Sequence, residues 1–201
     1  MTFGQTEGPP LLTLVCHPSC DPGAVEWIGV CVRRVQDSLV LRFQLDGCLD
    51  RLAIPPMREP ERRDELWRHT CFEVFVRRPG ESGYAEFNLS PSGEWAAYRF
   101  DAYRSRTREL EVVQAPTAEI RRSEGRLDVA LCIAPVPEPW SRAEALRVAA
   151  SAVVEDADGA LAYWALAHPA GAPDFHHAVG FVLELGTAEG DAGSCGPPAK
   201  P

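Results

Sequence analysis

An all-β fold built from antiparallel strands is the class that this sequence predicts. Apolar and polar residues alternate with a period of two along many short segments, and helical spacing is almost absent. The turn chemistry agrees, because Ser90-Pro91-Ser92-Gly93 suits a type I turn with a glycine bulge and Asp158-Gly159 suits a tight hairpin. Many short strands with so little helix indicate a sandwich or a barrel.

The alternation places the strands in order along the chain. The segments with strand character are residues 25–33, 39–45, 71–76, 84–90, 94–100, 127–133, 148–155, 161–168 and 181–185. Turns join the segments 71–76, 84–90 and 94–100 into a meander over residues 71–100. We expect one domain over residues 11–185. Residues 1–10 contain two glycines and two prolines, and residues 186–201 are rich in Gly, Ala and Pro with almost no large apolar side chain, so both ends are predicted to be disordered.

Composition excludes some partners and indicates a compartment. The formal net charge of -9 disfavours nucleic acid and anionic membranes, since both require a positive face. No apolar stretch is long enough for a membrane helix, and the N-terminus shows no secretory signal pattern. The seven cysteines form no Cys-x-x-Cys motif and their number is odd. We therefore expect free thiols and a cytoplasmic location; the scarcity of lysine and asparagine is typical of a GC-rich bacterial genome.

One face of the meander carries the candidate site. Phe72 and Phe87 must both point into the core, so Glu73, Glu86 and Asn88 must share the opposite face. The full set predicted for that face is His69, Cys71, Glu73, Phe75, Tyr84, Glu86, Asn88, Tyr98 and Phe100. Such a face is either a plain solvated surface or a ligand platform, on which rings stack and polar groups fix hydroxyls. The two glutamates also resemble a glycosidase acid pair, which we disfavour.

The same residues resemble a known family. Residues 66–75, LWRHTCFEVF, and 84–95, YAEFNLSPSGEW, resemble the bacterial DOMON-like domain proteins, which are related to family 9 carbohydrate-binding modules. A second stretch, residues 155–176, is similar to the same family. The resemblance covers about residues 11–185 and implies a single jelly-roll-like antiparallel β-sandwich of about ten strands. Relatives of this kind bind sugars or haem, and the carbohydrate modules also hold calcium.

The remaining candidate residues are aromatic rings and histidines. Trp67, just before a strand, is a candidate sugar-stacking residue, although a core position is equally plausible, and Tyr98 lies on the candidate face. The C-terminal candidates are Trp164, for which a core role is favoured, His168 and His176. For haem, Met57 with one of His69, His168, His176 or His177 would supply the ligands. Asp156-x-Asp158-Gly159 has the character of a calcium loop, but a hairpin turn explains it better.

These observations predict a non-enzymatic domain that binds a small ligand, with carbohydrate the leading class. No Gly-x-Ser-x-Gly elbow is present, and Cys71 near His69 in sequence does not make a catalytic pair. The ligand-binding residues expected are Trp67, His69, Glu73, Glu86, Asn88, Tyr98, Trp164, His168 and His176. A haem-binding domain and a protein-interaction module are the alternatives. Neither haem nor calcium is favoured as a cofactor.

Overall fold

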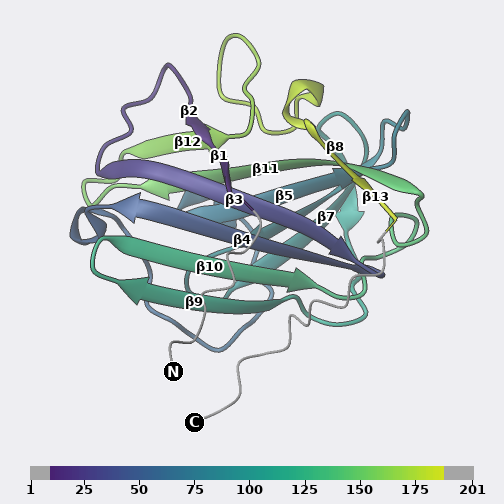
Figure 1. Cartoon of the computed structure of the whole chain (residues 1–201), viewed down its shortest axis with the longest axis horizontal. Helices are drawn as coiled ribbons and strands as arrows, with labels where there is room; N and C mark the ends of the chain where they lie inside the picture. Colours follow the sequence, from purple (N-terminus) through teal and green to yellow (C-terminus); the bar gives the residue numbers. More distant parts are fainter. Residues whose placement is uncertain (1–9, 188–201) are drawn as a thin grey trace, which may run out of the picture.

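Two antiparallel sheets pack face to face in the computed structural model, which describes residues 10–187 (Figure 1). The first sheet has five strands in the order β1-β3-β4-β10-β9. Its strands are β1 (Leu12–Thr13), β3 (Val25–Val35), β4 (Ser38–Gly47), β9 (Thr117–Ser123) and β10 (Arg126–Ile133).

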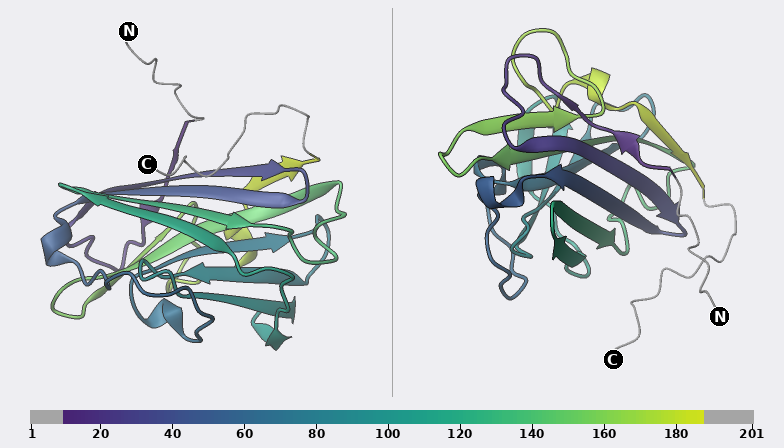
Figure 2. Two further views of the ribbon diagram at one scale, coloured as in Figure 1. Left: turned by 90° about the horizontal axis from the view of Figure 1, so that it is seen from below. Right: turned by 60° about the vertical axis from the view of Figure 1, so that its left-hand side comes forward.

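The second sheet has eight strands and carries the candidate site. Its order is β2-β12-β11-β5-β6-β7-β8, and β13 pairs with β11 beside this path. Its strands are β2 (Val15–Cys16), β5 (Cys71–Arg77), β6 (Tyr84–Leu89), β7 (Trp95–Ala102), β8 (Ser105–Glu109), β11 (Ala145–Glu155), β12 (Leu161–Ala165) and β13 (Leu183–Gly186). Figure 2 shows the two sheets as stacked layers. The all-β sandwich predicted from the sequence is confirmed.

The apolar core lies between the two sheets, as strand alternation requires. From the meander it takes Phe72, Val74, Val76, Ala85, Phe87, Leu89, Trp95 and Ala97. The Phe72 ring lies 5.0 Å from that of Phe43 on β4, so the two sheets interdigitate here. The inward face expected from the sequence is therefore confirmed.

The turn between β6 and β7 fixes the register of the meander. Gly93 adopts a φ of 91°, which a glycine bulge requires and other residues avoid. The amide of Gly93 donates to the carbonyl of Ser90, and the amide of Ser90 donates to the carbonyl of Glu94, both at 2.9 Å. Asn88 then faces Ala96 across β6 and β7.

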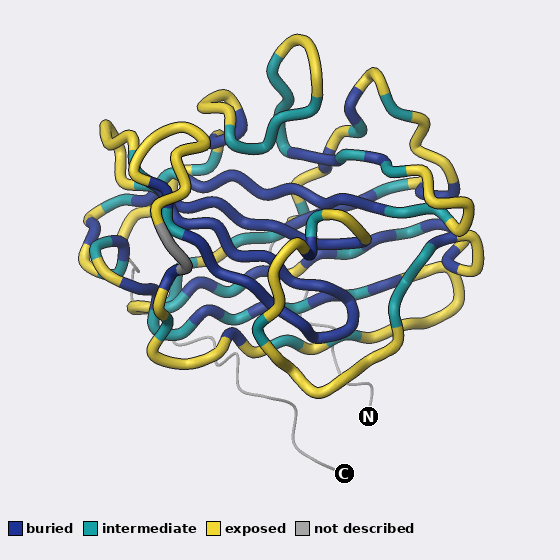
Figure 3. The backbone as a smooth tube through the Cα atoms, turned by 180° about the vertical axis from the view of Figure 1, so that it is seen from behind, coloured by how far each residue is buried: buried dark blue, intermediate teal, exposed yellow. Residues whose placement is uncertain are grey.

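The eight-stranded sheet is buried on its outer face as well as its inner one. Every residue of β6 is buried, and Figure 3 shows the central strands buried beneath exposed loops. A second apolar cluster, which includes Phe75, Tyr84, Tyr98, Phe100 and Phe181, covers part of this outer face. Loops therefore cover the face that carries the two glutamates, and this accounts for their burial.

Three short helices complete the described chain: η1 (Leu49–Arg51), η2 (Leu66–Arg68) and η3 (Ala178–Gly180). Each is a single 3-10 turn, and in residues 10–187 no helix is long and apolar enough to cross a membrane. Of the cysteines, the six within the described range are free and form no disulfide with one another.

Thirteen strands are present in the described residues, where about ten were expected. The sequence missed β1 and β2, which have two residues each, and the edge strands β8 and β9. Edge strands such as β9, with Glu119, Arg121 and Arg122, lack clean apolar alternation because water reaches them. The folded range extends to Gly186 in β13, one residue into the predicted tail, and residues 1–9 and 188–201 lie outside the description.

Candidate functional site

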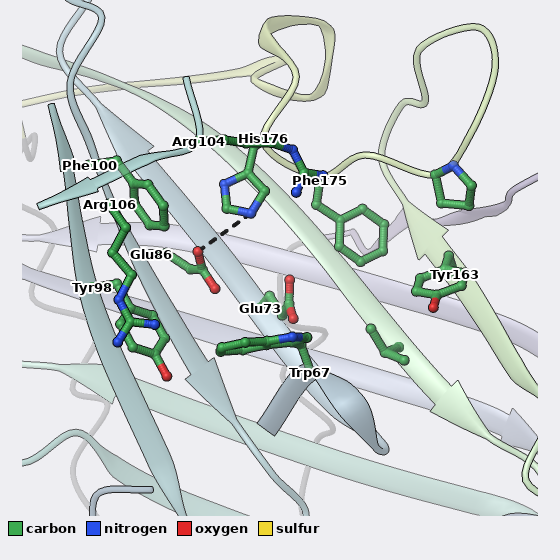
Figure 4. Close-up of a pocket in the computed structure, with 12 residues that line it drawn as sticks. Trp67, Glu73, Glu86, Tyr98, Phe100, Arg104, Arg106, Tyr163, Phe175 and His176 are labelled. Carbon is green, nitrogen blue, oxygen red and sulfur yellow. Dashed lines mark ion pairs between the residues drawn. The ribbon is translucent and has the colours of Figure 1, made fainter. Parts of the chain in front are cut away.

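A cavity of about 320 Å³ opens on the outer face of the eight-stranded sheet (Figure 4). Glu73 on β5 and Glu86 on β6 lie on its floor, and aromatic side chains from several elements surround them. The lining consists of Trp67, Glu73, Glu86, Tyr98, Phe100, Arg104, Arg106, Val153, Tyr163, Pro173, Phe175 and His176. We call this cavity the outer-face pocket.

Strand register brings the predicted polar trio together. Glu73 pairs with Asn88 across β5 and β6, and Asn88 follows Glu86 on the same face of β6. The amide nitrogen of Asn88 donates to Oε1 of Glu86 at 2.8 Å. Glu73, Glu86 and Asn88 are thus neighbours on the non-core face, as the alternation of Phe72 and Phe87 predicts.

These polar groups are buried more deeply than their hydrogen bonds can satisfy. Glu73, Glu86 and Asn88 are 3%, 4% and 1% exposed. Within residues 10–187, Oε1 of Glu73 and Oδ1 of Asn88 have no hydrogen-bond partner. A buried acceptor without a partner costs about 1–3 kcal/mol, so folded proteins rarely retain one without a reason.

The pKa values of both carboxyl groups are raised. Burial raises the pKa of Glu73 well above its usual range, and the negative charge of Glu86 raises it further. Burial also raises the pKa of Glu86 to about 7, although the hydrogen bond from Asn88 and the positive charges of Arg106 and Arg104 oppose the shift. The pair therefore holds protons to higher pH than free carboxyl groups do, and a protonated carboxyl group beside an ionised one offers a ligand both a donor and an acceptor.

A hydrogen-bond chain orients His176 toward this pair. The amide of Arg104 donates to the hydroxyl of Tyr84 at 3.1 Å, and that hydroxyl lies 2.8 Å from Nδ1 of His176. Burial lowers the pKa of His176 to about 4, so the ring is neutral, and burial raises that of Tyr84 to about 12. The Tyr84 hydroxyl consequently donates to Nδ1, which leaves the ring proton on Nε2.

Nε2 of His176 faces Oε2 of Glu86 at 3.9 Å. Figure 4 shows the ring above the glutamates at the edge of the pocket. The separation is too long for a hydrogen bond, so the N–H remains free to donate to an oxygen placed beside Glu86.

Aromatic rings and arginines form the rim. Trp67 from η2 meets Tyr98 edge to face at 5.7 Å, and Phe175 meets Tyr163 in the same way at 6.0 Å. Arg106 lies over the Tyr98 ring, 4.2 Å from its centre. Apolar rings around a polar floor are the typical make-up of a small-molecule site.

Ion pairs fix the rim in place. Arg104 pairs with Asp174 at 2.8 Å, and Asp174 also accepts a hydrogen bond from the amide of His176 at 3.1 Å. Arg106 pairs with Asp64 at 3.3 Å, and the hydroxyl of Tyr98 donates to Asp64 as well. The loop that carries His176 is therefore bound to the turn between β7 and β8.

Sequence reasoning missed several lining residues. Arg104 lies in the turn between β7 and β8, Arg106 lies just after it, and Phe175 lies in a loop, and no sequence motif marks any of these positions. Tyr163 could have been found, because β11 and β12 pair Tyr163 with Val153, whereas Trp164 pairs with Ala152. That alternation puts Tyr163 on the outer face and Trp164 in the sandwich core, so the ligand-binding role predicted for Trp164 is corrected.

Two predicted histidines lie away from the pocket. His69 pairs with Glu155 at 2.7 Å and lines a different depression near Arg58 and Arg63. Nε2 of His168 contacts the carbonyl of Val15 at 2.8 Å, and its ring packs against His17. Both stand in connections that follow or precede the strands, so strand alternation does not set their direction. Trp67, Glu73, Glu86, Tyr98 and His176 do meet in one place, and Asn88 lies beneath them.

The residues of the outer-face pocket do not fit the haem or calcium considered above. Met57 is 57% exposed, lies near the Ser90–Gly93 turn and is absent from the pocket lining, so it forms no Met–His haem pair there with His176. For calcium, no group of three or more acidic, His or Cys side chains within the described residues has metal-binding geometry. Asp158 instead accepts a hydrogen bond from the amide of Ala160 at 3.1 Å, as a hairpin turn requires.

Comparison with known proteins gives matches of fold without matches of sequence. No protein-family model and no curated protein matches this chain. A protein from Bacteroides uniformis, to which carbohydrate binding is provisionally ascribed, superposes with a TM-score of 0.60 at 14% identity, over 88% of this chain and 84% of that one. A family 9 carbohydrate-binding module from Caldicellulosiruptor kristjanssonii, in complex with cellotriose, gives a TM-score of 0.54 at 10% identity, over 96% and 88%. The chain therefore shares the β-sandwich fold of these proteins.

Proposed function

We propose that this protein is a non-catalytic carbohydrate-binding domain and that the outer-face pocket is its ligand site. The observation that carries the proposal is the unpaired, buried oxygen of Glu73 in a pocket walled by aromatic rings. A sugar presents hydroxyl donors for such an oxygen and an apolar face for a ring.

Each part of the pocket has a role in this proposal. Trp67 stacks on the apolar face of the sugar ring, while Glu73 accepts its hydroxyl protons. Asn88, beneath the floor of the pocket, orients Glu86 through its hydrogen bond. The Nε2–H of His176 donates to a sugar oxygen placed beside Glu86. A volume of about 320 Å³ is near the lower end of ligand sites, which favours one or two sugar units.

A binding role is preferred to catalysis and to protein interaction for two reasons. The fold is shared with a module that binds cellotriose, which supports binding as the function. The outer face is hollowed rather than flat, and a concave site suits a small ligand better than a protein surface.

Replacing Trp67 tests the proposal. A glycan array followed by calorimetry would first identify a sugar that binds the wild-type chain. Trp67→Ala should then weaken binding by about 1–3 kcal/mol, the scale at which a well-placed aromatic contact acts. Trp27→Ala is the matched control, because Trp27 lies on β3 of the other sheet, where its indole N–H donates to Thr13 at 3.1 Å. Equal affinities for the two variants, or no sugar bound by wild type, would overturn the assignment.

A further inference from the structure

The outer-face pocket combines two features that together suit a positive charge. Its floor holds two carboxyl groups, one with a buried oxygen that has no partner in the described chain. Figure 4 shows Glu73 and Glu86 between Trp67, Tyr98, Phe100 and Phe175. The faces of aromatic rings carry negative electrostatic potential, so rings around a carboxylate attract cations more than a carboxylate alone does.

The arginines at the rim do not cancel this preference. Arg104 is paired with Asp174 and Arg106 with Asp64, so each brings its own counter-charge. Arg106 already demonstrates the cation-binding character of the rim, since its guanidinium lies over Tyr98. The remaining negative charge of the pocket therefore comes from the ionised fraction of Glu73 and Glu86, whose pKa values are both raised.

We propose that the outer-face pocket selects an amino sugar whose ammonium group lies between Glu73, Glu86 and the face of Trp67. This inference rests on the proposed function, because the sugar ring supplies the remaining contacts. The ammonium donates to the carboxyl group of Glu73, which lines the pocket, and to Oε2 of Glu86, the oxygen that Asn88 does not use. A neutral sugar offers these oxygens hydroxyl donors only and adds no charge attraction.

Selection of a cation couples binding to proton release. The ammonium stabilises the ionised form of Glu86, which at neutral pH still holds part of a proton. The charged and titratable groups that face Glu86 are Glu73 and Cys71 from β5, Tyr84 from β6, Arg104 and Arg106, Asp64 and His176. Burial raises the pKa values of Cys71 and Tyr84, so neither group loses a proton near neutral pH. Of these, His176 is neutral throughout and the two arginine–carboxylate pairs stay charged, so Glu73 and Glu86 supply the proton.

Calorimetry with glucosamine and glucose as probes tests the inference. Glucosamine should bind wild type at least about tenfold more tightly than glucose, a difference of about 1.4 kcal/mol. Titrations in two buffers of different ionisation enthalpy should show protons released with glucosamine. Affinity for glucosamine should rise about tenfold from pH 5.5 to pH 7 as Glu86 ionises, while affinity for glucose should not rise.

Variants separate the charge from the shape of the site. Glu86→Gln keeps the acceptor that Asn88 uses and should lower the glucosamine-to-glucose preference to about twofold or less. Glu73→Gln should act in the same direction, and it provides a second measurement if the first variant unfolds. Glu155→Gln removes an equal charge at His69, outside the pocket, and should leave the preference intact.

These measurements distinguish a failure of cation selection from a failure of sugar binding itself. If glucose binds wild type as tightly as glucosamine, and Trp67→Ala weakens that binding, the selection of a cation is wrong while sugar binding stands. If neither probe nor any glycan binds, the proposed function itself is wrong.

Discussion

The two faces of β5 and β6 carry very different side chains on the same backbone. The inner face presents Phe72, Val74 and Phe87, whose apolar side chains fill the space between the sheets. The outer face presents Glu73, Glu86 and Asn88, which are equally buried, and within residues 10–187 Glu73 and Asn88 each keep one oxygen without a hydrogen-bond partner. Burial on the inner face serves stability, whereas burial on the outer face costs stability, and a cost of that kind is typical of a functional site.

The largest effect should come from the inner face. Phe72→Ala removes a fully buried ring that contacts Phe43 across the sandwich, and we expect a loss of about 3–5 kcal/mol in the free energy of unfolding. Urea unfolding followed by circular dichroism measures it. A loss below about 1 kcal/mol would show that the two sheets do not interdigitate at this point.

The pH dependence of stability should report the raised pKa of Glu86 on the outer face. Glu86 has a folded pKa of about 7 against an ordinary 4.5, so between these values the native state keeps a proton that the unfolded chain has lost. Raising the pH through this window therefore destabilises the fold, by about 3 kcal/mol in full, and below pH 4.5 the effect disappears.

Glu86→Gln isolates this contribution from that of His176, which titrates in both proteins. The variant should equal wild type near pH 4.5 and become progressively more stable than wild type toward pH 7.5. A stability difference that stays constant with pH would mean that Glu86 ionises normally in the folded protein.

A smaller effect of opposite sign is expected from the neighbour of Phe72. Glu73→Met keeps the length of the side chain and removes its buried polar atoms, so it should raise the free energy of unfolding at neutral pH by about 1–2 kcal/mol. The same variant should lose sugar binding. If Glu73→Met is instead destabilised by more than about 1 kcal/mol, Glu73 is a structural residue, and the contrast between the two faces fails.

The sequence predicted the meander well because its information is local. Strand alternation and the Ser90–Gly93 turn together determine which of Phe72 and Glu73 points inward, and the structure agrees. Strand alternation applied to β12 would have placed Tyr163, rather than Trp164, among the ligand-binding residues of the outer face. Strand alternation is therefore sufficient to predict which residues form the floor of the pocket.

The rim required information that alternation does not contain. His176 reaches the pocket through its contact with Tyr84, 92 residues away in the chain, and Arg104 through its pair with Asp174. Loop residues have no period that sets their direction, so only the three-dimensional arrangement separates His176, at the pocket, from His69 and His168, outside it.

The central claim is that a sugar binds over Glu73 and Glu86. The most direct measurement is an NMR titration of the chain labelled with ¹³C at the glutamate side-chain carboxyl carbon, in the presence of the sugar identified by the array. We expect the resonances of Glu73 and Glu86 to move with the binding curve, while those of Glu94 and Glu155, which lie outside the pocket, stay in place. Saturable binding that leaves Glu73 and Glu86 unmoved would contradict the account and place the ligand elsewhere on the protein.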